Sequence, residues 1–156
     1  MRDREFPQRP IVGIGVVVIE IGVVVIEDDR VLLIRRGKEP RRGTWSLPGG
    51  AQELGESVAQ GAVREAKEET GLDIEIIGLL DVVDSIDTDD SGAVRFHYTL
   101  VDFVGRPVGG TVGASGDAAE VRWFDREGLS SLGLWSETER IIGLAFEFED
   151  LLRGQS

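Results

Sequence analysis

The side chains best suited to chemistry in this sequence lie in residues 50–72, GAQELGESVAQGAVREAKEETGL, which follow the spacing G-x5-E-x7-R-E-x-x-E-E-x-G. The fixed positions of this pattern are Gly50, Glu56, Arg64, Glu65, Glu68, Glu69 and Gly71. If residues 57–70 are helical, the last three glutamates share one face because they are three and four residues apart. Like-charge pairs at this spacing each destabilise a helix by roughly 0.2–0.5 kcal/mol. A divalent cation would offset that cost, so the pattern predicts a metal site for phosphate chemistry.

The simpler alternative is a solvated acidic face on a surface helix, which is the usual meaning of clustered charge. Solvation alone requires neither the flanking glycines nor a single arginine among the acids. Arg64 directly precedes Glu65, where a guanidinium could orient the carboxylate and keep it ionised. These positions favour the metal site over the solvated face.

The pattern resembles the signature of the Nudix hydrolases over 23 of the 156 residues, with Ala66 and Leu72 in its two apolar positions. The resemblance implies an α/β fold, an α/β/α sandwich around a mixed β-sheet. It also implies an enzyme that hydrolyses a phosphoanhydride with Mg2+ or Mn2+ as cofactor. The implied catalytic residues are Glu65, Glu68, Glu69 and Arg64. The implied metal ligands are Gly50, through a backbone carbonyl there or at Gly49, and Glu56, Glu65, Glu68 and Glu69.

Several side chains outside this segment could complete the site. Asp117 and Glu120 follow the Gly-rich segment before a short predicted strand, and in many Nudix relatives an acid from this region joins the metals or acts as the base. For Glu120 a solvent-facing strand position is an equal alternative, because strand residues alternate between faces. Arg35, Arg36, Arg41 and Arg42 could bind phosphate, with Arg35 and Arg41 preferred, although simple solvation is expected for at least two of the four. Trp135 is the tryptophan best placed to stack on a base.

Composition excludes several classes of function. The formal net charge is −12, from 17 basic and 29 acidic residues, so binding of a nucleic-acid polymer or an anionic membrane is not expected. The chain has no cysteine and one histidine, which excludes thiolate sites and His-rich zinc sites and favours metals that prefer oxygen ligands. The N-terminus is charged and does not resemble a secretory signal, so a cytoplasmic protein is expected.

A perfect tandem repeat, IGVVVIE, occupies residues 14–20 and 21–27. Because seven is odd, equivalent residues of the two copies point to opposite faces of an extended strand, so only one copy can take the ordinary place. The second copy precedes a polar turn and is the natural hairpin partner of residues 31–36. The first copy is then surplus, and a bulge, a break or a projecting edge is expected. Such an edge could pair two chains, so a homodimer is possible.

The remaining pattern predicts the order of elements around the acidic helix. Residues 37–50 form a loop, and residues 73–84 and 94–104 form a strand hairpin. Residues 120–124 form a short strand. A last helix runs from Ser136, capped by Ser136 with Glu139, to about Leu152. Residues 1–156 are expected to be one domain with a flexible segment at 1–10.

The substrate class remains open between several hypotheses. The segments HYTLVDF and DAAEVRWF are similar to those of small bacterial ADP-ribose pyrophosphatases, which implies a nucleoside diphosphate linked to another moiety as substrate. An (oxidised) nucleoside triphosphate is the main alternative substrate. A different class of function, a Nudix domain that senses a nucleotide without cleaving it, usually lacks some of these carboxylates. Here they are all present.

Overall fold

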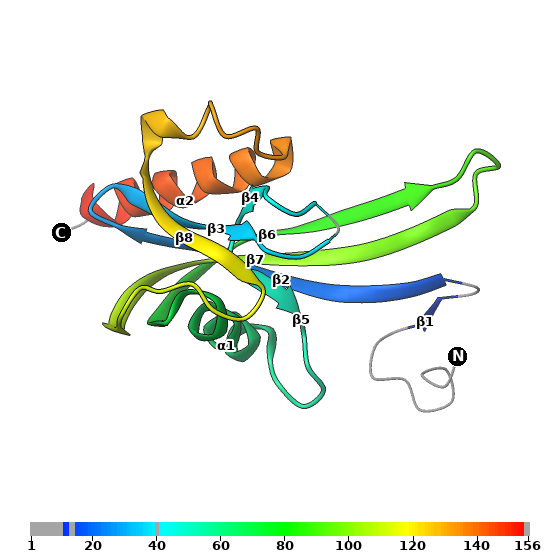
Figure 1. The fold of residues 1–156 in the computed structure, drawn as a ribbon, viewed down its shortest axis with the longest axis horizontal. Coiled ribbons are helices and arrows are strands. Elements are labelled where there is room, and N and C mark those ends of the chain that lie inside the picture. The colour runs from blue at the N-terminus through cyan, green and yellow to red at the C-terminus, as the bar shows by residue number, and fades with distance from the viewer. Residues whose placement is uncertain (1–10, 13–14, 40, 155–156) are drawn as a thin grey trace.

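The computed structural model describes residues 11–12, 15–39 and 41–154, which fold into a mixed β-sheet covered by a helix on each side (Figure 1). The strands are β1 (Ile11–Val12), β2 (Gly15–Glu27), β3 (Arg30–Arg36), β4 (Trp45–Ser46), β5 (Gly49–Ala51), β6 (Leu72–Thr88), β7 (Val94–Gly110) and β8 (Ala118–Asp125). The helices are α1 (Val58–Thr70), α2 (Ser136–Gly154) and the 3-10 turn η2 (Arg126–Gly128). The main path through the sheet is β4-β3-β2-β7-β6, in which only β2 and β7 are parallel neighbours. The predicted α/β sandwich around a mixed sheet is confirmed.

Strand β2 contributes to the core on both of its faces. Val24 packs with Ile141 and Ile142 of α2, whereas Val23 packs with Ala62 of α1 on the other face of the sheet. A strand covered on both faces is apolar along its whole length instead of alternating. This explains the continuous run of valine and isoleucine at Val23–Ile26.

The tandem repeat lies within the single strand β2, apart from Ile14, which is outside the described residues. The second copy supplies the buried residues Val23–Val25 and forms the predicted hairpin with β3. The first copy continues in line and pairs with β7 without any change of register. The expected bulge or break is therefore not found within Gly15–Glu27. Instead, β2 extends with β6 and β7 well beyond the helices, and these three strands form a projecting arm (Figure 1).

The β6–β7 hairpin is longer than the sequence pattern predicted. The prediction was residues 73–84 and 94–104, but the antiparallel ladder runs from Leu72 paired with Gly110 to Thr88 paired with Val94. Cross-strand backbone hydrogen bonds sustain the ladder even where the side chains become polar or small. The polar ends of both strands concealed this extension from the sequence pattern.

The ends of α1 agree with the sequence. Ser57 accepts a hydrogen bond from the Gln60 backbone N–H at 3.1 Å, and Gln60 Oε1 accepts one from the Ser57 N–H at 2.8 Å. This reciprocal capping box fixes the start of the helix. Gly71, with φ 80°, ends the helix in the left-handed conformation, as predicted.

The start of α2 differs from the prediction. Ser136 is the first helical residue, and the Glu139 N–H donates to the Trp135 carbonyl at 3.1 Å, so the predicted capping box of Ser136 with Glu139 does not form. Among the described residues, no helix has the length and apolar character needed to cross a membrane.

Candidate active site

Small residues hold α1 close to the sheet, and its acidic face lies directly beside them. Gly61, Ala62 and Ala66 are buried against the sheet, and a Cβ atom on Gly61 would collide with the Ile21 side chain of β2. This close approach fixes the rotation of the helix about its axis. The carboxylates of Glu65 and Glu69, which are next to these small residues around the helix, consequently meet the loop that precedes the helix.

The Gly49–Gly50 turn receives two of these carboxylates. It belongs to β5, which pairs with β2 and is thereby fixed to the sheet. The Gly49 N–H donates to Glu69 Oε1 at 2.7 Å. A Cβ atom on Gly50 would lie 2.5 Å from Glu65 Oε1, so only glycine leaves room for this carboxylate. Both acids therefore rest against the backbone of the turn.

Arg64 joins the loop to the helix. Its Nε donates to Glu56 Oε2 at 2.9 Å and its NH2 donates to Glu56 Oε1 at 2.7 Å, a bidentate pair. Its NH1 group donates to Glu65 Oε1 at 2.9 Å and to Glu68 Oε2 at 3.2 Å. The predicted positioning role of Arg64 is consistent with this geometry, since one guanidinium orients three carboxylates.

The pKa values of these groups reflect burial and mutual repulsion. Desolvation by burial raises the pKa of Glu69 to about 7, and the nearby charges of Glu65 and Asp117 raise it further, against the hydrogen bond from Gly49. Desolvation also raises the pKa of Glu65. The hydrogen bonds from Arg64, by contrast, lower the pKa of Glu56. Glu65 and Glu69 are therefore ionised only at a cost, which a nearby cation would reduce.

The donor set suits a hard divalent cation in its chemistry. Glu65, Glu68 and Glu69 offer carboxylate oxygens on one helix face, and the Gly49–Gly50 turn adds backbone carbonyls beside them. Within the described residues, however, no three acidic or histidine side chains already stand close enough together to share one ion. Binding would require side-chain rotation on the acidic face. The room that Gly50 leaves beside Glu65 is compatible with such movement.

The structure separates the two acids predicted outside the helix. Asp117 precedes β8 and is close enough to raise the pKa of Glu69, although its carboxylate pairs with Lys38 Nζ at 2.7 Å. Glu120 pairs instead with Arg35 at 3.1 Å and with Arg122. Asp117 is therefore beside the acidic face of α1, whereas the described ion pairs of Glu120 are made to arginines of β3 and β8.

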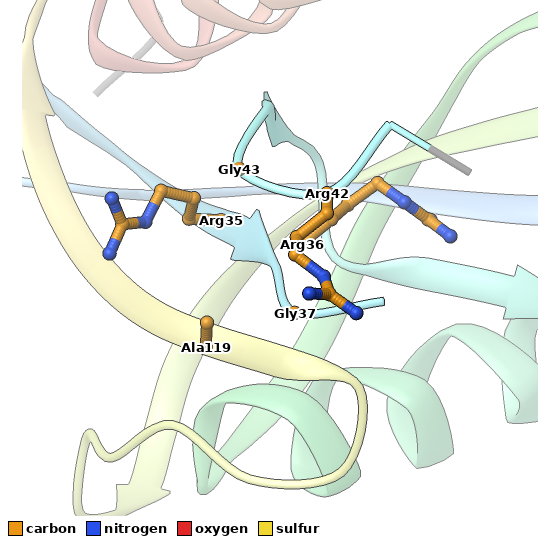
Figure 2. A pocket seen from close by; sticks show the side chains of 6 residues that line it. All are labelled: Arg35, Arg36, Gly37, Arg42, Gly43 and Ala119. Carbon is orange, nitrogen blue, oxygen red and sulfur yellow. The ribbon is translucent and has the colours of Figure 1, made fainter. Parts of the chain in front are cut away.

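A cavity of about 330 Å3 opens at the end of β3, next to this acidic face (Figure 2). It is lined by Arg35, Arg36, Gly37, Arg42, Gly43 and Ala119. Arg35 Nε is buried and has no hydrogen-bond partner among the described residues, and Arg36 lies near enough to lower the pKa of Glu69. Arg41, preferred as a phosphate-binding residue in the sequence analysis, is not among the lining residues, whereas Arg42 is. The directions of side chains along an irregular loop cannot be predicted from sequence, so nothing in the sequence distinguished Arg41 from Arg42.

A second group of charged side chains, on the α2 side of the sheet, had no counterpart in the sequence analysis. It comprises Asp81, Asp102, Glu137 and Arg140, in which Arg140 pairs with Asp81 at 2.7 Å and with Glu137 at 2.6 Å. Trp135, predicted to stack on a base, directly precedes α2 and is 47% exposed. The register between β6 and β7 brings the two aspartates together. Only the paired strands reveal that proximity.

Comparison with known proteins agrees with the fold. Residues 17–143 match the NUDIX domain family model. An ADP-ribose pyrophosphatase from Methanocaldococcus jannaschii is 39% identical over 119 residues, which cover 76% of this chain and 67% of the relative. The mouse 8-oxo-dGDP phosphatase NUDT18 is 36% identical over 113 residues, which cover 70% of this chain but 32% of the relative. The chain thus spans about a third of the mouse protein.

Solved structures give the same result. A MutT NUDIX hydrolase from Burkholderia pseudomallei is 28% identical and superposes with a TM-score of 0.70 over 82% of this chain and 97% of that chain. An ADP-ribose pyrophosphatase from Streptococcus suis is 26% identical, with a TM-score of 0.66 over 85% of this chain and 91% of that chain. The chain therefore belongs to the Nudix family of pyrophosphohydrolases.

Proposed function

We propose that this protein hydrolyses the phosphoanhydride bond of a nucleoside diphosphate linked to another moiety, an ADP-ribose-like substrate, with Mg2+ or Mn2+. The observation that carries the proposal is the gathering of Glu56, Glu65, Glu68 and Glu69 around Arg64 and the Gly49–Gly50 turn. We also propose that residues 1–156 act as one Nudix domain, which the match over residues 17–143 supports.

The side chains have distinct roles in this proposal. Glu68 and Glu69, with a carbonyl of the Gly49–Gly50 turn, would hold the cation, and Glu65 would bind it or act as the base. When bound, the cation neutralises phosphoryl oxygens and lowers the pKa of a water molecule. Arg64, through its forked pair with Glu56, keeps the loop and the helix in a fixed relation while charge moves on the substrate.

The cavity at the end of β3 offers a site for a phosphate of the substrate. Residues 35–42 contain five of the 17 basic side chains of an otherwise acidic protein. Arg36 and Arg42 point toward the same side of the loop, whereas Arg35 points away from them (Figure 2). We propose that Arg36 and Arg42 attract the phosphates, and that Arg35 contributes its buried Nε from the other side of β3.

The choice of substrate class rests on the relatives. The archaeal relative, 39% identical, is an ADP-ribose pyrophosphatase, and it supports the ADP-ribose-like substrate. The NUDT18 relatives are 8-oxo-dGDP phosphatases, and they support an oxidised nucleotide as the second candidate. Because the chain covers a smaller share of the NUDT18 relatives, the first candidate has the better support.

A hydrolysis screen in which the nucleotide products are separated by chromatography tests the proposal. ADP-ribose, NADH, dinucleoside polyphosphates, nucleoside triphosphates and 8-oxo-dGDP would each be incubated with the protein and Mg2+, Mn2+ or EDTA. Hydrolysis of ADP-ribose that depends on the cation is the expected result. Preferred hydrolysis of the oxidised nucleotide would transfer the assignment to the second candidate.

A matched pair of variants tests the site. Glu69→Gln removes one charge from the acidic face and is expected to lower kcat by a factor of about 100–1,000, in the range observed when one electrostatic contact to a transition state is lost. Glu75→Gln makes the same change at an exposed position of β6 and should leave kcat unchanged. If no substrate is turned over, or if both variants match the parent, the catalytic reading fails and a nucleotide-sensing domain is favoured.

A further inference from the structure

A segment distant in sequence, residues 111–117, caps the C-terminal end of α1 and lies beside that helix (Figure 1). The last carbonyl groups of a helix have no partner within the helix and need donors from elsewhere. The Gly113 N–H donates to the Thr70 carbonyl at 2.9 Å, and Ser115 provides two further donors. All residues of the segment are exposed, so hydrogen bonds and not packed side chains hold it in place.

Ser115 binds the backbone of two residues whose side chains belong to the acidic face. Its hydroxyl group donates to the Glu68 carbonyl, and its N–H donates to the Glu69 carbonyl at 3.4 Å. The proposed function assigns both of these glutamates to the cation. Ser115 therefore fixes the segment to the same residues that would hold the ion.

A tight turn connects Ser115 rigidly to Asp117. The Ala118 N–H donates to the Ser115 carbonyl at 3.1 Å, which closes a four-residue turn. Gly116, with φ 60°, supplies the left-handed conformation in this turn. The Gly37 N–H donates to the Asp117 carbonyl at 2.9 Å. The backbone of Asp117 is thus held between the end of β3 and, through Ser115, the end of α1.

The carboxylate of Asp117 is near Glu69 and is only weakly engaged. Its charge contributes to the raised pKa of Glu69, which requires the two acids to be close. Its ion pair with Lys38 Nζ, at 2.7 Å, joins side chains that are 61% and 69% exposed. Water screens such an exposed pair, so the carboxylate can exchange Lys38 for a divalent cation.

We propose that Ser115 is a positioning residue: by fixing the turn to the carbonyls of Glu68 and Glu69, it holds Asp117 where it shares a divalent cation with Glu69. The inference rests on the proposed function only in that the acidic face of α1 binds such a cation. Without the Ser115 hydroxyl, the exposed segment loses one of its few anchors. Asp117 must then be ordered when the ion binds, and that ordering weakens the affinity.

Binding of Mn2+ tests the inference without any hydrolysis. Electron paramagnetic resonance of free Mn2+ would give dissociation constants for the parent, Ser115→Ala, Asp117→Asn and the double variant. Ser115→Ala should weaken binding about 10-fold, as expected for a residue that orients a metal ligand. In the Asp117→Asn background the same substitution should have no further effect, because the ligand that it positions is already lost. Ser115→Thr keeps the hydroxyl group and should bind Mn2+ like the parent.

The double variant separates positioning of Asp117 from a general loosening of α1. If Ser115 only secured the end of the helix, its loss would act on Glu68 and Glu69 directly. Ser115→Ala would then weaken binding equally with and without the Asp117 carboxylate, and that result would overturn the inference. If Ser115→Ala does not fold, Ser115→Cys, whose thiol is a weak donor, takes its place in the comparison.

The matched control is Ser131→Ala. The Ser131 hydroxyl also donates to a backbone carbonyl in an exposed loop, that of Gly128 at 3.4 Å, and its loss should leave Mn2+ affinity unchanged. An unchanged affinity in Ser115→Ala, or no measurable Mn2+ binding by the parent, would overturn the inference. Hydrolysis by a protein whose Mn2+ affinity is insensitive to Ser115→Ala would refute this inference alone. The expected coupling of Ser115 with Asp117 without turnover of any substrate would refute the proposed function alone.

Discussion

Arg64 acts through the shape of its side chain as well as through its charge. Its guanidinium makes two parallel hydrogen bonds to Glu56 and has one nitrogen left for Glu65 and Glu68. The Arg64 side chain is 21% exposed, so these bonds are only partly screened by water. An ammonium group on a flexible stem cannot reproduce this fork.

Arg64→Lys should therefore lower both activity and stability while conserving charge. We expect kcat to fall by a factor of about 10–100, because Glu65 and the loop lose their common support. The free energy of unfolding should fall by about 1–3 kcal/mol, since partly buried carboxylates lose donors. Steady-state kinetics and urea unfolding measure both quantities. The control Arg106→Lys, at an exposed position of β7, should change neither, and equal effects in both variants would contradict the role of the fork.

The buried Asp102 predicts a pH-dependent gain of stability in Asp102→Asn. Desolvation raises the pKa of Asp102 from 3.8 to about 6, so between these values the folded protein binds the proton more tightly than the unfolded chain. Its contribution to stability is therefore present below pH 3.8 and is lost as the pH rises through about 6. The Asn variant cannot ionise, so it should exceed the parent by roughly 1–3 kcal/mol at neutral pH and match it near pH 4. Urea unfolding at both pH values measures the difference in unfolding free energy between Asp102→Asn and the parent. A difference that does not change with pH would contradict a raised pKa at Asp102.

At the scale of elements, the sequence predicts what is encoded locally. The end of α1 follows from Gly71, and its acidic face follows from the spacing of the glutamates, whereas the capping box of Ser57 with Gln60 was not predicted. The β2–β3 hairpin follows from its polar turn. Contacts that depend on register, such as Asp81 beside Asp102, could not be predicted, because a shift by one residue reverses every side chain. Likewise, loop geometry decides that Arg42 and not Arg41 lines the cavity.

Replacing glycine by alanine is expected to have opposite effects on stability in the two helices. Gly143 in α2 is exposed, and a Cβ atom there would meet no other atom within 4 Å. Gly143→Ala should therefore raise the free energy of unfolding by about 0.5–1 kcal/mol through helix propensity. Gly61→Ala in α1 should lower it, because the new methyl group would collide with Ile21 and force the helix off the sheet. Thermal unfolding measures the stability of both variants. An increase in both would show that α1 does not pack against the sheet as described.

At the scale of the whole molecule, the body and the projecting arm have different roles. The body contains both clusters of buried side chains and the acidic face of α1. The arm consists of the outer parts of β2, β6 and β7 (Figure 1). Ile86 of β6 and Phe96 of β7, near the end of their hairpin, are exposed apolar side chains. The first copy of the repeat leads from the arm to the body, where Glu20 pairs with Ala51 of β5, and the second copy belongs to the body.

Deleting one copy of the repeat, residues 14–20, should therefore leave activity intact. Gly13 would then precede Ile21, so every residue from Ile21 onward keeps its place in the sheet. We expect kcat/KM to stay within a factor of about three, equivalent to roughly 0.7 kcal/mol in the barrier. Kinetics and circular dichroism measure the outcome. Deletion of the seven residues of β3 is the contrasting control and should abolish folding, and loss of folding in both would show that the arm is required.

The identity of the two copies has a consequence for how the chain reaches this structure. Residues 14–20 carry the same side chains as residues 21–27, so a shift of β2 by seven residues would fill the core with an identical set of atoms. The displaced copy would then lengthen the turn before β3, at a loop-closure cost that grows only slowly with length. Two registers of β2 thus compete for the same position beside β7. Refolding of the parent should accordingly include a slow phase of register exchange that the shortened chain lacks.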